Sequence, residues 1–325
     1  MHKILVVERI HQAGEKMLAE KAQLVYPKPQ NREGILAVIG DCDALVARNT
    51  LITREIMEAA PRLAVIGRHG VGYDNVDIAA ATERGIRVVY TPAANTESVV
   101  EISIGFMICL GRKIIRAHAA MQAEELLSDT VTMAIRTREK GLINADLWGK
   151  TLGVIGVGRI GSAVSRRMAA AFNMRVLGYD PYVDAETLAG YGAQKIDTLE
   201  EMLPLCDFVA VHCSGGAGTR HLVNARTLAL MKPSAYLINT ARGTIVDEKA
   251  LVEALREKRI AGAAIDVYDP EPPRPGNPLL HMENVIVTPH FCAMTEESLY
   301  NMATVVAQGV LDVLEGREPQ YPVVP

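Results

Sequence analysis

Three residues in the C-terminal half could carry out acid–base chemistry on an anionic substrate: Arg242, Glu271 and His290. Each follows a short apolar run, in "AYLINTARG", "AAIDVYDPEPP" and "NVIVTPH". If the runs are parallel strands, their carboxyl ends meet at one edge of a sheet, where open α/β folds bind ligands. A guanidinium can hold a carboxylate, and a histidine can exchange a proton near neutral pH. Taken singly, Arg242 could pair with a surface acid, and Glu271 and His290 could be solvated loop residues.

The elements that must position these residues alternate along nearly the whole chain. Short β-branched runs are separated by helix-like segments, which is typical of βαβ units and parallel sheets. The first series of expected strands is "KILVV", "AQLVY", "DALVA", "LAVIG" and "IRVVY". The second series is "TLGVIG", "MRVLGYD", "DFVAVH", "AYLINT", "AGAAIDVY" and "NVIVTPH". Six strands in the second series suit a dinucleotide-binding sheet.

The two series predict two doubly wound parallel-sheet domains of the α/β class. We expect residues 1–98 with 294–325 to form the first domain, to which the last helix returns, and residues 99–293 to form the second. Between the two series, residues 96–150 begin as a long apolar helix and become a polar, irregular stretch from residue 124 onward.

Bulk composition excludes several classes of partner. A net charge of −4 over 325 residues predicts neither nucleic acid nor membrane binding. The five cysteines are scattered without a CxxC motif, so we expect no metal site, no disulfide framework and a reducing cytoplasm. We expect no signal peptide, because the N-terminal residues go straight into a strand-like run, and the apolar run 99–111 is too short to span a bilayer.

A glycine motif in the second domain predicts a dinucleotide site. "GVGRIG" contains Gly156, Gly158 and Gly161, enclosing Arg159 and Ile160, and it follows an apolar strand and opens a helix. Alone, the pattern could be a structural turn, but the context is that of a Rossmann fingerprint, with the pyrophosphate on the helix N-terminus. Asp180 lies 24 positions after Gly156, at the end of the next strand. Its carboxylate could bond the adenosine ribose and repel a 2′-phosphate, which favours NAD over NADP.

These motifs, with "GRHGVGYDNVD" and "ERGIRVVYTPAANTESVVE" in the first domain, closely resemble the D-isomer-specific 2-hydroxyacid dehydrogenases over nearly the whole chain. The nearest subgroup is the D-3-phosphoglycerate dehydrogenases. The resemblance implies a flavodoxin-like substrate domain with a Rossmann NAD-binding domain inserted into it. It also implies a homodimer. Phosphoglycerate dehydrogenases often carry a C-terminal regulatory domain. We expect this chain to lack that domain, and we therefore expect no feedback regulation by serine.

The resemblance also implies roles for individual residues. Arg242 would hold the substrate carboxylate and polarise its 2-oxo group, His290 would be the acid/base, and Glu271 would orient the imidazole and favour its protonated form. Asp266 would hold the nicotinamide carboxamide. Further cofactor contacts would come from Cys213, Thr240 and Ala241, and substrate contacts from Val71, Gly72 and Asn95.

Two arginines bear on the kind of acid. Arg48 and Arg68, the latter beside His69, stand just past strand ends of the first domain, and related phosphoglycerate dehydrogenases have arginine there. Either could instead be a solvated surface residue. We expect them to bind a second anionic group, as in D-3-phosphoglycerate or phosphohydroxypyruvate. The alternatives are a hydroxypyruvate, glyoxylate or other 2-oxo acid reductase, and a non-enzymatic NAD-sensing protein.

The chain departs from the family at three places. Residues 119–146 match poorly, in the region that contributes to the dimer contact in relatives. Cys213–Ser214 replaces a Thr-Pro or Val-Pro pair beside the cofactor, and Phe291–Cys292 replaces a small pair. We therefore expect the nicotinamide pocket to differ in shape from that of relatives.

Overall fold

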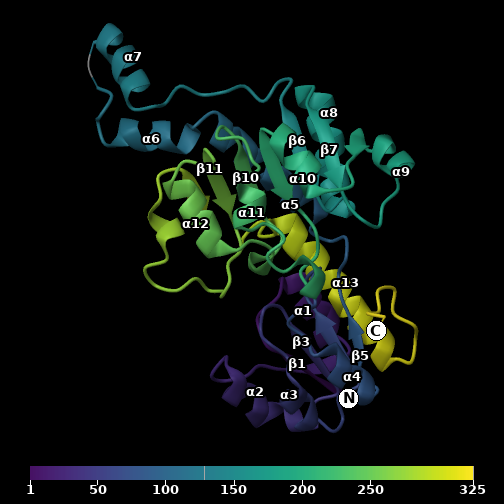
Figure 1. Ribbon diagram of the computed structural model, residues 1–325. Helices are drawn as coiled ribbons and strands as arrows, with labels where there is room; N and C mark the ends of the chain where they lie inside the picture. Colours follow the sequence, from purple (N-terminus) through teal and green to yellow (C-terminus); the bar gives the residue numbers. More distant parts are fainter. Residues whose placement is uncertain (128, 325) are drawn as a thin grey trace. The chain divides into compact units, whose positions relative to one another are not determined.

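The two series of apolar runs form two separate parallel sheets in the computed structural model, which describes residues 1–127 and 129–324 (Figure 1). The chain divides into two units. Unit 1 comprises Met1–Ser98 and Ala293–Pro325, and unit 2 comprises Val99–Cys292. Within the described residues, no helix is both long and apolar enough to cross a membrane.

The unit 1 sheet has five parallel strands in the order β2-β1-β3-β4-β5. This is the flavodoxin-like order, and the expected fold class of this domain is confirmed. The strands are β1 (His2–Val6), β2 (Ala22–Val25), β3 (Ala44–Ala47), β4 (Val65–Arg68) and β5 (Arg87–Val89).

Helices cover both faces of the unit 1 sheet because alternate strand residues point to opposite faces. Ile4 and Val6 pack with α1 (Gln12–Ala19) and α13 (Glu296–Leu314). Leu5 and Val7 belong to a second core with the remaining helices. These are α2 (Arg32–Val38), α3 (Arg54–Glu58) and α4 (Ile78–Glu83).

The unit 2 sheet has seven parallel strands in the order β12-β11-β10-β9-β6-β7-β8, the Rossmann order with one added strand. The strands are β6 (Thr151–Ile155), β7 (Arg175–Tyr179), β8 (Ala193–Lys195), β9 (Phe208–Val211), β10 (Tyr236–Asn239), β11 (Gly262–Ile265) and β12 (Val285–Val287). The expectation of six strands was wrong by one. The missed strand, β8, is a three-residue edge strand in which only Ala193 is buried, so it has no apolar run to reveal it.

Two cores lie on the two faces of the unit 2 sheet. Val209 and Val211 face one core, whereas Phe208 and Ala210 face the other. The first core takes in α10 (Leu199–Met202), α11 (Ala225–Leu228) and α12 (Glu248–Arg256). The second takes in α5 (Thr96–Gly111), α8 (Arg159–Phe172) and α9 (Ala185–Gly190). Single 3₁₀ turns are η1 (Ile39–Asp41), η2 (Leu203–Leu205), η3 (Ala217–Thr219), η4 (Gly243–Ile245) and η5 (Pro278–His281).

The stretch after α5 is more regular than expected. It holds α6 (Ile114–Gln122) and α7 (Thr130–Glu139), so the expectation of an irregular segment from residue 124 was wrong. Asp129 caps α7 by accepting hydrogen bonds from the N–H groups of Val131 and Thr132, both at 3.1 Å. None of the described residues of α7 is buried, so the helix has no apolar stripe that a periodicity search could detect. Residue 128, within the divergent segment 119–146, lies outside the described residues.

Candidate active site

The three candidate catalytic residues follow three neighbouring strands of unit 2. Arg242 comes after β10, Glu271 after β11 and His290 after β12, and these strands are adjacent in the sheet. The register pairs Asn239 with Ile265 and Ile265 with Val287, so the three strands end nearly level. The carboxyl edge of the sheet therefore presents a guanidinium, a carboxylate and an imidazole from adjacent loops.

Glu271 and His290 are in direct contact. The Nδ1 atom of His290 lies 2.5 Å from Oε1 of Glu271, and the two side chains are about one-third exposed, at 34% and 37%. The bond at Nδ1 orients the ring and leaves Nε2 as the atom that can exchange a proton with a ligand. His290 has a φ of 53°, a left-handed conformation that is uncommon for a residue other than glycine.

Asp266 holds the turn that carries His290. Its side chain is fully buried and accepts hydrogen bonds from the Thr288 hydroxyl (2.5 Å) and from the N–H groups of Phe291 (3.0 Å) and Cys292 (3.2 Å). The Asp266 carbonyl also accepts the His290 N–H at 2.8 Å. The structure thus gives this carboxylate a positioning task within the protein, while its contact with the nicotinamide remains a prediction.

The Arg242 turn is shaped by a buried asparagine. The Asn239 amide donates to the Arg242 carbonyl at 3.0 Å, and its oxygen accepts the Ala241 N–H at 3.1 Å. The Arg242 Nη1 donates to the Ala241 carbonyl at 2.7 Å. The hydroxyl oxygen of Thr240, just before this turn, lies 3.2 Å from the hydroxyl oxygen of Ser103.

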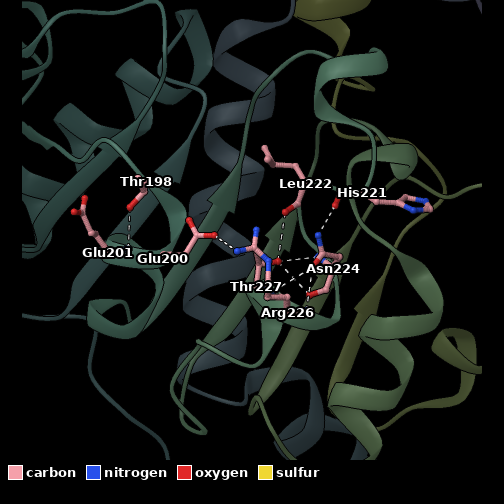
Figure 2. A network of polar contacts seen from close by, with 8 residues as sticks. All are labelled: Thr198, Glu200, Glu201, His221, Leu222, Asn224, Arg226 and Thr227. Carbon is pink, nitrogen blue, oxygen red and sulfur yellow. Dashed lines mark hydrogen bonds and ion pairs between the residues drawn. The ribbon is translucent and has the colours of Figure 1, made fainter.

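The segment 221–227, whose polar contacts Figure 2 shows, bonds to the residues that follow the same turn. The N–H groups of His221 and Val223 donate to the carbonyls of Thr244 (2.9 Å) and Ile245 (3.0 Å), two and three residues after Arg242. The segment is held in turn by a capping box of Asn224 and Thr227 at the start of α11, drawn in Figure 2. Arg226 in that helix pairs with Glu200 of α10. Arg242 therefore lies in a loop that these contacts support.

The glycine motif forms one wall of a cavity of about 390 Å³ in unit 2. Gly156 has a φ of +87°, and a Cβ there would lie 2.4 Å from the Cys213 nitrogen. A Cβ on Gly161 would lie 2.1 Å from the Gly156 carbonyl oxygen, so this glycine lets α8 approach the loop. At Gly158, by contrast, a Cβ would meet no described atom within 4 Å.

The open space at Gly158 fits a dinucleotide pyrophosphate. Gly158 is the N-cap of α8 and, in the described part of the chain, no side chain caps this helix end. The first N–H groups of α8, beginning at Arg159 and Ile160, are thus available to an anion at the positive end of the helix dipole. Asp180 lines the same cavity and accepts the N–H groups of Val157 (2.8 Å) and Tyr182 (2.9 Å). Gly156, Gly158 and Asp180 thus line one cavity.

Two further side chains line this cavity. Cys213 was predicted to contact the cofactor, and burial raises the pKa of its thiol to about 11. His212 was not predicted, although its position one residue past β9 was a usable signal. Burial lowers its pKa to about 4, and its Nδ1 lies 3.5 Å from the Thr240 hydroxyl. The imidazole is therefore neutral at pH 7.

The predicted substrate residues all belong to unit 1. Arg68 ends β4 and is only 8% exposed, so it is not a solvated surface arginine. Its Nη1 donates to the His69 carbonyl at 2.5 Å. Arg48 follows β3 with its Nη2 2.8 Å from the Met294 sulfur, and burial lowers the pKa of its guanidinium. Val71 and Gly72 are in the loop after β4, and the buried Asn95 Oδ1 has no hydrogen-bond partner among the described residues.

Comparison with known proteins identifies the family. Residues 104–292 match the family model described as D-isomer specific 2-hydroxyacid dehydrogenase, NAD binding domain. The chain is 43% identical over 317 residues to D-3-phosphoglycerate dehydrogenase of Methanocaldococcus jannaschii, covering 97% of this chain and 58% of that protein. It is 38% identical over 319 residues to the human D-3-phosphoglycerate dehydrogenase, covering 98% of this chain and 57% of the relative. The chain thus spans somewhat over half the length of these curated relatives.

Solved structures agree with this relationship. The TT0316 protein of Thermus thermophilus superposes with a TM-score of 0.88 at 34% identity, covering 99% of this chain and all of that one. An NADPH-dependent glyoxylate/hydroxypyruvate reductase from Sinorhizobium meliloti, in complex with NADP and malonate, gives a TM-score of 0.85 at 30% identity, covering 99% and 97% of the two chains. The protein belongs to the D-isomer specific 2-hydroxyacid dehydrogenase family.

Proposed function

We propose that the protein interconverts a D-2-hydroxy acid and its 2-oxo acid by NAD-dependent hydride transfer. The observation that carries the proposal is the 2.5 Å contact between His290 and Glu271, beside Arg242 at the carboxyl edge of the unit 2 sheet. A proton donor oriented by a carboxylate, next to a guanidinium, suits the reduction of an anionic ketone.

Each of the three residues has a distinct task in this reaction. Arg242 binds the substrate carboxylate through its guanidinium fork and polarises the neighbouring carbonyl. His290 donates a proton from Nε2 to the carbonyl oxygen during reduction and takes it back from the hydroxyl during oxidation. Glu271 keeps the imidazole in place through Nδ1. The bound nicotinamide supplies or accepts the hydride at the substrate carbon.

NAD is the cofactor that the glycine-lined cavity fits. Gly158 leaves room for the pyrophosphate, and Asp180 places a carboxylate where a 2′-phosphate of NADP would lie. The related Sinorhizobium reductase was crystallised with NADP, so cofactor choice varies among structural neighbours. Asp180 is therefore the residue on which the preference of this chain for NAD depends. Asp266 is assigned to the nicotinamide carboxamide, and Thr240 and Ala241 to the cofactor through their backbone.

The substrate we assign carries a second anionic group, as D-3-phosphoglycerate does. Arg48 and Arg68 at the carboxyl edge of the unit 1 sheet supply the positive charge for it, and the curated relatives are D-3-phosphoglycerate dehydrogenases. Backbone groups of Val71 and Gly72, and the unpaired Asn95 oxygen, are assigned to the same substrate. A hydroxypyruvate or glyoxylate reductase is the second candidate, favoured by the similarity to the Sinorhizobium enzyme. A purely NAD-sensing protein would have no use for the His290–Glu271 pair.

A homodimer in the cytoplasm is the proposed state of the protein. Large apolar side chains are exposed from α6 through the segment between α7 and β6, where they would be covered by a second copy. They are Ile114, Ile115, Met121, Leu127, Val131, Met133, Ile135, Ile143 and Trp148. The five cysteines are free thiols in the described structure, which suits a reducing compartment.

The test of the proposed function is NADH oxidation with a panel of 2-oxo acids: phosphohydroxypyruvate, hydroxypyruvate, glyoxylate, pyruvate, 2-oxoglutarate and oxaloacetate. We expect phosphohydroxypyruvate to have the highest kcat/KM. Preference for hydroxypyruvate or glyoxylate would establish the second candidate. Binding of NADH without turnover of any acid would contradict the enzymatic proposal.

A further inference from the structure

Two buried polar side chains at the carboxyl edge of the unit 1 sheet have unmet hydrogen-bonding capacity. His69 is 1% exposed and Thr91 is 0% exposed. Both ring nitrogens of His69 and the Thr91 hydroxyl oxygen are buried without a partner among residues 1–127 and 129–324. Buried polar atoms in folded proteins are nearly always paired, so unpaired ones point to a missing ligand or water.

The strand register places these side chains in one row with Arg48. Ala47 of β3 pairs with Arg68 of β4, so the next residues along, Arg48 and His69, are neighbours. Gly67 of β4 pairs with Val89 of β5, so His69 and Thr91, two residues further, are neighbours as well. Past the strand ends, the His69 N–H donates to the Ala47 carbonyl (2.9 Å), and the Thr91 N–H donates to the carbonyl of Gly70, the residue after His69 (3.0 Å). These contacts bring the segments that carry Arg48, His69 and Thr91 together at the carboxyl edge of the sheet.

Glu8 completes the row without blocking it. The pairing of Val6 with Val46 places Glu8 beside Arg48. Its carboxylate accepts the N–H groups of Arg48 (2.9 Å), Asn49 (3.0 Å) and Thr50 (2.8 Å), together with the Thr50 hydroxyl (2.8 Å). Glu8 therefore holds the backbone of the Arg48 loop. Beyond it, the row consists of the Arg48 guanidinium, the His69 imidazole and the Thr91 hydroxyl.

The imidazole in this row is uncharged. Burial lowers the pKa of His69 to about 4, and the nearby charges of Arg48 and Arg68 act in the same direction, while Glu8 acts in the opposite one. At neutral pH the ring thus offers one N–H donor and one acceptor nitrogen. The N–H is available to an oxygen of an anionic ligand without the cost of burying a third positive charge.

We propose that His69, with Thr91 beside it, is a specificity-determining residue that hydrogen-bonds the distal phosphate of a phosphomonoester substrate. The inference rests on the proposed function and names the substrate class for it. A phosphate has three terminal oxygens that can accept hydrogen bonds from the Arg48 guanidinium, the His69 ring and the Thr91 hydroxyl, while Arg68 adds positive charge. A phosphate also carries more negative charge than a carboxylate, which suits a site between the guanidinium groups of Arg48 and Arg68.

Two substitutions of His69 test the proposal through substrate selectivity. The quantity to measure is kcat/KM for phosphohydroxypyruvate divided by kcat/KM for hydroxypyruvate. In His69→Ala we expect this ratio to fall about 10-fold or more, because a hydrogen bond to a charged group is lost. His69→Gln keeps a donor and an acceptor and should restore part of the ratio. His118→Ala, which removes an exposed histidine of α6, is the matched control and should leave the ratio unchanged.

A binding measurement separates this proposal from the proposed function. With NADH present, 3-phosphoglycerate cannot react, so its affinity can be measured by calorimetry and compared with that of glycerate. We expect His69→Ala to weaken 3-phosphoglycerate binding selectively. An active enzyme whose selectivity and affinities do not change in His69→Ala would overturn the role of His69 and leave the dehydrogenase activity standing. A wild-type protein that turns over no acid, yet binds 3-phosphoglycerate through His69, would contradict the activity and support the subsite.

Discussion

Substitution of Gly158 by alanine should separate cofactor binding from folding. Gly158 has φ −74° and ψ −152°, which alanine can adopt, and the added Cβ would meet no described atom within 4 Å. Alanine is a poorer N-cap than glycine by less than about 1 kcal/mol. For a domain of this size such a loss lowers Tm by at most roughly 2–4 °C. The folded protein should therefore tolerate the change.

The same methyl group would occupy the space assigned to the pyrophosphate. Losing one hydrogen bond to a charged group costs about 1.5–3 kcal/mol. Since about 1.4 kcal/mol is a factor of ten, the dissociation constant for NADH should rise roughly 10- to 150-fold. The assay is titration of NADH fluorescence, with Tm measured on the same samples.

Gly161→Ala is the matched comparison. Its Cβ would lie 2.1 Å from the Gly156 carbonyl oxygen, so the helix or the loop must move. We expect this variant to lose both stability and NADH affinity, whereas Gly158→Ala loses affinity alone. If Gly158→Ala bound NADH as tightly as the wild type, the placement of the pyrophosphate at the start of α8 would be wrong.

Three further predictions follow from other parts of the structure. Asp180→Ser should lower the preference for NAD over NADP at least about 10-fold, because a charge that repels the 2′-phosphate is lost; an unchanged ratio of the two kcat/KM values would contradict this role. The pKa of His69 is lowered from 6.5 to about 4, so the unfolded chain takes up a proton that the folded protein does not. The resulting stability is present above about pH 6.5 and is lost as the pH falls toward about 4, by about 2.5 kcal/mol at about pH 4.5. In His69→Gln, the free energy of unfolding measured with urea should fall by about 2.5 kcal/mol less between neutral pH and about pH 4.5 than in the wild type. An equal fall in the two proteins would refute the assignment. Ile135→Asp replaces an exposed apolar side chain of α7 with a charge and should shift the protein from dimer to monomer in analytical ultracentrifugation, whereas an unchanged dimer would exclude this surface as the contact.

The features that could be predicted from the sequence are those with a repeating or local signal. Buried parallel strands are short apolar runs, and the glycine motif is a contiguous pattern, so both were recognisable. Strand β8 and helix α7 were not predicted because neither buries an apolar stripe. β8 buries only Ala193, and α7 depends on the Asp129 cap. Their formation depends on an edge position and on local hydrogen bonds.

Contacts between distant residues were beyond reach for a different reason. Asp266 was recognised as a site residue, but its bonds to Thr288, Phe291 and Cys292 depend on how two adjacent loops meet. The row of Arg48, His69 and Thr91 likewise arises only when three strands align in register. Arg48 could be singled out by its charge, whereas Thr91 became meaningful only beside its neighbours.

The most direct test of the account is the turnover of His290→Ala with the best acid of the panel. If His290 is the proton donor, kcat should fall about 10²- to 10⁴-fold, the range typical for loss of a general acid. NADH affinity should be unchanged, since the proposed role of His290 is proton exchange with the substrate and not cofactor binding. Near-normal turnover by His290→Ala would contradict the mechanism, because no proton would then depend on the imidazole that Glu271 holds.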